Sequence, residues 1–193
     1  MSGLSHFEQV RAFIEGGATL IQLREKRAKA GDWTMNAATA VRFAQDAGVR
    51  ILINDRVDMA KALKVDGVHL GQDDMPPVAA RLILGKRAII GYSTHTLEQV
   101  RDAVNMPIDY IAVGPIFNTQ TKENPDAIVG LRLIEQAKNE IGDLPLVAIG
   151  GINAGNLASV FAAGADSAAM IGTILARPDG LSKTIRELEK LVC

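Results

Sequence analysis

Short apolar runs alternate along the chain with amphipathic helical stretches, and no other feature of the sequence constrains the fold as strongly. Seven runs can be counted: ATLIQLR (18–24), RILIND (50–55), GVHLG (67–71), AIIGYS (88–93), YIAVGP (110–115), LVAIGG (146–151) and SAAMIG (167–172). Near-continuous apolar character is typical of parallel strands covered on both faces. The intervening stretches, such as DWTMNAATAVRFAQDAG, carry apolar residues at helical spacing. The pattern therefore predicts an α/β fold with a parallel sheet.

Polar or glycine residues follow nearly every apolar run. This favours a (β/α)8 TIM barrel over an open, doubly wound sheet, because in a barrel all the strand carboxyl ends meet at one mouth, where active sites lie. A chain of 193 residues is of the size of one domain, so we expect residues 1–193 to form a single barrel domain.

Composition excludes several classes of function. The chain has 21 basic and 22 acidic residues, which predicts no nucleic-acid or membrane partner. No apolar stretch approaches the roughly 20 residues that a membrane span needs, and MSGLSHFEQVRAF lacks the regions of a signal peptide. The single cysteine, Cys193, allows neither an internal disulfide framework nor a cysteine-based zinc site. We expect a cytoplasmic protein; its oligomeric state has no signature in the sequence.

Gln22, Arg24 and Lys26 alternate at the end of the first run, which places them on one face of a strand. Two cations on that face predict an anionic ligand such as a diphosphate, which Arg24 would clamp. The alternative is a solvated basic strand end.

Carboxylates follow the next two runs: Asp55 comes directly after the second run, and Asp74 follows the third. Carboxylates at neighbouring strand ends could share a Mg²⁺, which binds one or two protein carboxylates together with water and phosphate oxygens. Asn54 could bind the same ligand. The alternative is that Asp55 and Asp74 cap the helices that follow them.

Two further segments suit phosphate. Thr119, Thr121 and Lys122 lie in the loop GPIFNTQTK, where hydroxyls and a cation could bind a phosphate or a leaving group, although a plain polar loop is the alternative. Gly151 and Gly172 mark the ends of the last two runs, where barrels bind phosphate through backbone N–H groups. Tight turns would also require such glycines.

The histidines predict less. His69 lies inside a run and is interpreted as a core residue with satisfied hydrogen bonds, and His6 as a surface residue. His95 lies near a helix start, where capping by Thr94 or Thr96 competes with a functional role. The three do not resemble a zinc site.

The segments GGATLIQLREK, LINDRVDMA, DGVHLGQDD, IGYSTHT, YIAVGPIFNTQTK, AIGGIN and GADSAAMIG occur together and in order from about Gly16 to Ile174. Together they resemble the thiamine-phosphate synthase family. The resemblance implies a TIM-barrel transferase of thiamine biosynthesis with Mg²⁺ as cofactor. Its small phosphorylated substrates would be 4-amino-2-methyl-5-(diphosphooxymethyl)pyrimidine and hydroxyethylthiazole phosphate or its carboxylated form. Diphosphate would leave by dissociative substitution before the thiazole nitrogen captures the pyrimidine methyl cation.

The same resemblance implies a role for each matching residue. The groups that would bind the pyrimidine diphosphate are Gln22, Arg24, Lys26, Asn54 and Lys122, with Ser93 on the pyrimidine and Asp55 and Asp74 on Mg²⁺. Leu23 and Glu25 would be further substrate-binding residues. The groups that would bind the thiazole phosphate are Thr119, Gln120, Thr121, Gly151, Ile171 and Gly172. Arg24, Ser93 and Lys122 would be the catalytic residues. Gly172 stands where many members of the family have serine.

Two other functions remain open. The thiazole tautomerase relatives of the family share the barrel and work by acid–base chemistry, for which His95 would be the candidate. A non-catalytic, ligand-binding barrel is the other alternative.

The family's first strand has no counterpart in this chain, which is short at its amino-terminal end. Residues 1–5 are too short and too poor in β-branched residues to form a strand. The first ordered element should then be a helix from about His6 to Glu15 with Ser5 as its cap, and its inner face should comprise Phe7, Val10, Phe13 and Ile14. Runs 18–24 and 167–172 should flank a gap in the barrel. We expect the chain to be less stable than a version extended by a strand-forming segment.

Overall fold

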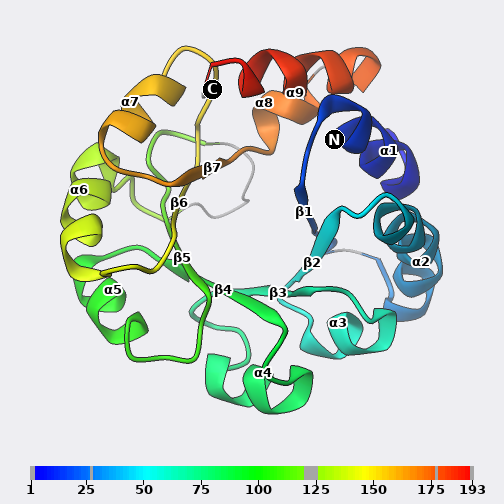
Figure 1. Cartoon of the computed structure of the whole chain (residues 1–193), viewed down its shortest axis with the longest axis horizontal. Helices are drawn as coiled ribbons and strands as arrows, with labels where there is room; N and C mark the ends of the chain where they lie inside the picture. The colour runs from blue at the N-terminus through cyan, green and yellow to red at the C-terminus, as the bar shows by residue number, and fades with distance from the viewer. Residues whose placement is uncertain (1–2, 27, 120–125, 177, 192–193) are drawn as a thin grey trace.

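The structure, a computed structural model, describes residues 3–26, 28–119, 126–176 and 178–191. Within these ranges a single parallel sheet curls around a central axis, and the helices form an outer ring around it (Figure 1). The strands are β1 (Leu20–Leu23), β2 (Arg50–Asn54), β3 (Gly67–Leu70), β4 (Ile89–Thr94), β5 (Tyr110–Val113), β6 (Leu146–Ile149) and β7 (Ser167–Ala169). The helices are α1 (His6–Gly16), α2 (Ala30–Asp46), α3 (Val57–Leu63), α4 (Pro77–Leu84), α5 (Leu97–Ala103), α6 (Gly130–Glu140), α7 (Leu157–Ala162), α8 (Gly172–Leu175) and α9 (Leu181–Glu189), with a 3-10 turn, η1 (Pro178–Gly180), before α9.

All seven apolar runs form strands, which confirms the predicted fold class. Each strand pairs in parallel with the next along the chain, in the order β1 to β7. In the described part of the chain no pairing joins β7 back to β1, so the sheet is a TIM-like barrel that lacks one strand, as predicted. Figure 1 shows β1 and β7 on the two sides of this open seam. No helix in the described ranges is long and apolar enough to cross a membrane.

Helix α1 begins where the sequence predicts. The Ser5 hydroxyl accepts a hydrogen bond from the Glu8 N–H at 3.3 Å, and the Glu8 carboxylate accepts one from the Ser5 N–H at 2.8 Å. This reciprocal capping box satisfies two donors that the first turn would otherwise leave unpaired. The predicted inner face packs on the core, and the Phe7 ring contacts Phe43 of α2 edge-on with centroids 5.3 Å apart.

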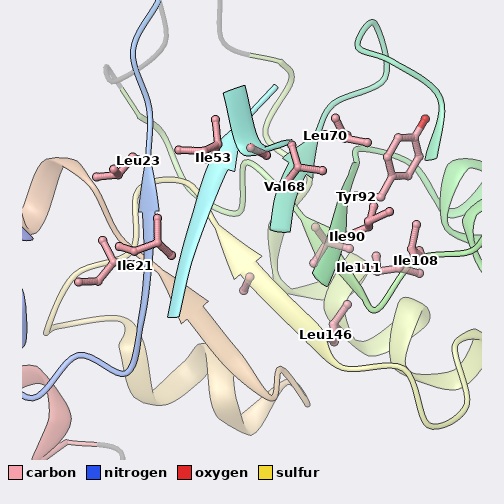
Figure 2. Packing of buried hydrophobic residues seen from close by; sticks show 14 of the residues in the cluster. Ile21, Leu23, Ile53, Val68, Leu70, Ile90, Tyr92, Ile108, Ile111 and Leu146 are labelled. Atoms are coloured by element: carbon pink, nitrogen blue, oxygen red, sulfur yellow. The ribbon is translucent and has the colours of Figure 1, made fainter. Parts of the chain in front are cut away.

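Two apolar cores follow from the alternation of side chains along the strands. The outer core lies between the sheet and the helices, and its strand residues include Ile53, Leu70, Ile90 and Ile111 (Figure 2). The inner core lies inside the curled sheet and contains Leu52, Tyr110 and Ala112.

Candidate active site at the carboxyl ends of the strands

Lys26, Asp55 and Asp74 meet at the carboxyl ends of β1, β2 and β3. The Lys26 ammonium forms an ion pair and hydrogen bond with the Asp55 carboxylate. The Asp74 carboxyl lies close enough to the Asp55 carboxylate for Asp55 to raise the pKa of Asp74, so the two acidic side chains are neighbours. The expected proximity of the two carboxylates is confirmed.

Neither carboxylate caps the helix that follows it. The N-cap positions of α3 and α4 are Arg56 and Pro76, and neither helix has a side-chain cap. The Asp55 backbone has a φ of 64° and its N–H donates to the His69 carbonyl at 2.8 Å. Asp74 instead accepts a hydrogen bond from the Gly71 N–H at 2.7 Å. The capping hypothesis is wrong for both residues, and their carboxylates face each other instead.

The proximity of the two carboxylates disfavours their simultaneous ionisation. Burial raises the pKa of Asp74 and the neighbouring Asp55 raises it further, whereas the Gly71 N–H and the charge of Lys26 act in the opposite direction. A cation at this position would remove the repulsion. No group of three or more His, Cys, Asp or Glu side chains within the described ranges forms a metal cluster, so a metal here would have two carboxylate ligands from the chain.

A polar column extends from this cluster into the barrel interior. The His69 side chain is buried, with its Nδ1 2.7 Å from the Tyr110 hydroxyl and its Nε2 2.8 Å from the Ser93 Oγ. Its ring stacks on Tyr110 with centroids 5.5 Å apart. The Tyr110 ring fits because residue 91 is glycine: a Cβ there would lie 2.0 Å from the Tyr110 Cζ.

The column places Ser93 at the mouth. Its carbonyl accepts a hydrogen bond from the Gln72 side chain at 2.6 Å, while its hydroxyl contacts His69. The interpretation of His69 as a core residue with satisfied hydrogen bonds is confirmed. The interaction with Tyr110 was missed, although strand alternation places residue 110 on the same inner face as Ala112, which pairs with Ser93.

The side chains of the β1 segment differ in orientation. Gln22 is exposed, whereas Leu23 packs in the outer core and is 4% exposed, so only its backbone is available to a ligand at the mouth. Arg24 and Glu25 are half-buried, and the Glu25 carboxylate accepts a hydrogen bond from the Ala28 N–H at 3.2 Å. Asn54 is half-buried at the end of β2 and pairs in register with His69.

Tight turns follow β6. Gly150 and Gly151 have φ values of 99° and 66°. A Cβ on Gly151 would lie 2.4 Å from the Asn118 carbonyl oxygen, so this turn packs directly on the loop after β5. The positive φ values and the close packing require glycine at both positions.

The turn after β6 is also tied to the end of β7. The Thr173 hydroxyl in α8 donates to the Ile152 carbonyl at 2.6 Å. Ile171 precedes α8 and is partly exposed, and Gly172 is its first residue. The loop after β5 reaches the same region with a half-buried Thr119, whereas Gln120, Thr121 and Lys122 lie outside the described residues.

His95 is held away from the acidic pair. Its Nδ1 lies 2.5 Å from the Gly114 carbonyl oxygen, and its Nε2 lies 3.6 Å from the Asp126 carboxylate. The cap of α5 is Thr96, whose hydroxyl accepts a hydrogen bond from the Gln99 N–H at 3.2 Å, whereas Thr94 is buried and donates to the Ala112 carbonyl. The expected cap near His95 is therefore Thr96.

The family model and the curated relatives that match this chain describe the same enzyme family. The family model described as thiamine monophosphate synthase matches residues 2–174. Thiamine-phosphate synthase of Syntrophomonas wolfei is 41% identical over 190 residues, which span 97% of this chain and 90% of the relative. The same enzyme of Chloroflexus aurantiacus is 42% identical over 98% of this chain and 87% of its own length.

A solved structure agrees with these matches. The thiamine phosphate pyrophosphorylase of Pyrococcus furiosus superposes with a TM-score of 0.86 at 34% identity, over 96% of this chain and 88% of that one. The family match extends over both the acidic pair and the glycine turns, which are the parts of the mouth described above. The chain belongs to the thiamine monophosphate synthase family.

Proposed function

We propose that this chain is a transferase of thiamine biosynthesis that carries out the thiamine-phosphate synthase reaction, which joins a pyrimidine methyl diphosphate to a thiazole phosphate with release of diphosphate. Membership of the family supports the reaction, and relatives of nearly the same length carry that name. The structural observation that carries the proposal is the meeting of Lys26, Asp55 and Asp74 at the barrel mouth.

The residues present fit a magnesium ion. Asp55 and Asp74 offer hard oxygen ligands, and their mutual repulsion gives a cation a reason to bind there. When bound, Mg²⁺ would neutralise negative charge on the departing diphosphate. Lys26 already pairs with Asp55 and would supply a second positive charge at the same place.

The cations of the β1 segment would hold the diphosphate. Arg24 lies two residues before Lys26 in the segment that follows β1, and its guanidinium could make paired hydrogen bonds to phosphate oxygens. Gln22 and Asn54, at the ends of the neighbouring strands β1 and β2, would complete the contacts. A diphosphate fixed in this way is a better leaving group because its developing charge meets preorganised positive groups.

The polar column would orient the pyrimidine. The Ser93 hydroxyl is held by His69 and the Ser93 carbonyl by Gln72, so the hydroxyl has a fixed position at the mouth. A hydroxyl fixed in this way can direct one edge of a polar ring without moving when the substrate binds. Ser93 therefore contributes orientation, and no protein nucleophile is required.

The opposite side of the mouth would receive the second substrate. Thr119 and Gly151 lie on adjoining loops, and Gly172 begins α8 close to the turn after β6. Backbone N–H groups of such turns and of a first helical turn can donate to a phosphate. The thiazole phosphate would thus be held across the mouth from Arg24, with its ring directed towards the pyrimidine.

An assay with both substrates and Mg²⁺ tests the proposal. We expect thiamine phosphate and diphosphate to form in equal amounts, and only when both substrates are present. A protein that isomerises a thiazole carboxylate phosphate without forming a coupled product would instead be a tautomerase. Binding of either substrate without turnover would identify a non-catalytic barrel.

A further inference from the structure

A second hollow lies at the end of the barrel opposite the candidate active site. It has two lobes with volumes of about 460 and 320 Å³, which share Val65, Leu84 and Ala88 as an apolar floor. These residues belong to the turn before β3, the end of α4 and the turn before β4, so the hollow opens at the amino ends of the strands. We call it the basal groove. It shares no residue with the mouth.

Four cationic side chains line the basal groove. Arg50 and Arg87 line the larger lobe, and Lys61 and Lys64 line the smaller one. None of the four forms an ion pair with another residue of the described ranges. Four neighbouring charges of one sign repel each other and attract an anion.

The single carboxylate among the lining residues does not neutralise them. Asp66 lines the larger lobe, and its Oδ2 accepts a hydrogen bond from the Ile51 N–H at 2.8 Å. This bond ties the carboxylate to the start of β2. The groove therefore keeps an excess of positive charge around an apolar floor.

The backbone at Lys64 gives an independent indication. Gly17, Gly48 and Gly164 stand at comparable turns from a helix to a strand, with φ values of 103°, 71° and 104°. At the turn after α3, Lys64 has a φ of 52° and is the C-cap. A side chain in this left-handed conformation carries a steric cost that glycine avoids. A strained lysine that lines a cationic groove has a rationale if its side chain binds something there.

We propose that the basal groove binds a small anionic molecule with an apolar group, of the class of aryl or alkyl phosphate monoesters. The phosphate would lie among the four cations, where the arginines can make paired hydrogen bonds. The apolar group would cover Val65, Leu84 and Ala88. The volume of the larger lobe lies within the range of small-molecule sites. The proposal does not depend on the reaction at the mouth.

Titration followed by backbone amide NMR tests the proposal, with phenyl phosphate, inorganic phosphate and phenol as probes. We expect phenyl phosphate to shift the amides of Val65, Ala88 and Ile89 in a saturable way, and at least tenfold lower affinity for each of the other two probes. The amides of Asn54 and Gly151 report separately on the mouth. Shifts confined to those amides, or equal affinity for all three probes, would overturn the proposal.

A double variant, Lys61→Ala with Lys64→Gly, provides the matched test. Glycine accepts the φ of residue 64 without the steric cost of a Cβ, so the turn should be retained and the thermal midpoint should not fall. Affinity of the groove for phenyl phosphate should fall at least tenfold, whereas Lys183→Ala, on the far helix α9, should leave it unchanged. Unchanged affinity in the double variant rejects the assignment. Tighter binding of a short DNA duplex than of phenyl phosphate to the same amides would also reject it, in favour of a nucleic-acid surface.

Discussion

Similar apolar runs form strands in two different environments. The central strands, β3 and β5, lie inside the sheet, whereas the seam strands, β1 and β7, lie at its two edges. Every residue of β3 and β5 is buried. Exposed and buried residues alternate along β1, and no residue of β7 is buried. The difference arises because each central strand has a neighbour on both sides, whereas β1 and β7 border the open seam. An apolar run predicts a strand, and its neighbours decide how much it contributes to stability.

The candidate site spans both regions. Asp55 follows β2, Asp74 follows β3 and Ser93 lies within β4, so all three belong to strands with a neighbour on both sides. Each is held by hydrogen bonds to groups of the neighbouring strands and loops. Gln22 and Arg24 belong to the β1 segment, and Gly172 follows β7. We therefore expect the metal and pyrimidine contacts to be preorganised, and the diphosphate contacts of β1 to depend more on the bound ligand.

The largest expected effect is on the free energy of unfolding, and it distinguishes a leucine of a central strand from a leucine of a seam strand. Leu70 of β3 is fully buried, so Leu70→Ala should lower the free energy of unfolding by about 2–5 kcal/mol. Leu20 of β1 is 48% exposed, and Leu20→Ala should cost less than about 1 kcal/mol. Urea unfolding of both variants measures this difference. Equal losses would mean that the seam is covered in solution and that the comparison does not hold.

The next effect concerns turnover. Arg24→Ala should lower kcat/KM roughly ten- to a hundredfold, because a charge-assisted hydrogen bond to phosphate worth about 1.5–3 kcal/mol is lost. Lys183→Ala removes an exposed cation of α9 that pairs with Glu187, and should leave turnover unchanged. Steady-state kinetics of the two variants provides the measurement. Similar kcat/KM values for the Arg24→Ala and Lys183→Ala variants would show that Arg24 does not bind the diphosphate.

A smaller effect tests the polar column of the central strands. Tyr110→Phe removes the hydroxyl bonded to His69 and should destabilise the fold by about 1–2 kcal/mol. Tyr92→Phe is the matched control, because Tyr92 is also buried but lies in the outer core. Thermal unfolding should separate the two variants. If Tyr110→Phe and Tyr92→Phe lower the thermal midpoint equally, the hydrogen bond between Tyr110 and His69 makes no net contribution to stability.

The smallest effect depends on pH. The pKa of Asp74 is raised in the folded protein, mainly by burial and then by Asp55, so its ionisation opposes folding at pH values above the raised pKa. At pH values below 3.8, the ordinary pKa of the group, the Asp74 carboxyl is protonated in both the folded and the unfolded protein, so its cost to folding disappears. Without Mg²⁺, Asp74→Asn should therefore raise the unfolding midpoint at neutral pH and leave it unchanged in acid. A variant that is less stable at neutral pH contradicts the assigned repulsion.

The sequence predicts the strands well because each buried parallel strand needs an uninterrupted apolar run. It also predicts the capping box of α1, since Ser5 and Glu8 form a local motif with a defined spacing. The gap between β1 and β7 follows from counting runs, and the structure confirms it.

The environment of individual side chains is harder to predict. Asp55 and Asp74 fitted both metal binding and helix capping, and the left-handed backbone of Asp55 that excludes capping has no signature in the sequence. Leu23 was included among the binding residues although strand alternation turns its side chain to the outer core. Tyr110 was missed because its contact with His69 joins β3 to β5 across Gly91, and such a contact depends on the curl of the sheet.

Equilibrium binding of diphosphate, with and without Mg²⁺, tests the central claim that the mouth is a metal-assisted diphosphate site. Calorimetric titration should show tight binding in the presence of Mg²⁺ and at least tenfold weaker binding in a chelator. Asp74→Asn and Arg24→Ala should each reduce the metal-dependent affinity by a similar factor, whereas Lys183→Ala should not. Equal affinity in Mg²⁺ and in chelator, or unchanged binding by the Asp74→Asn variant, would contradict the account.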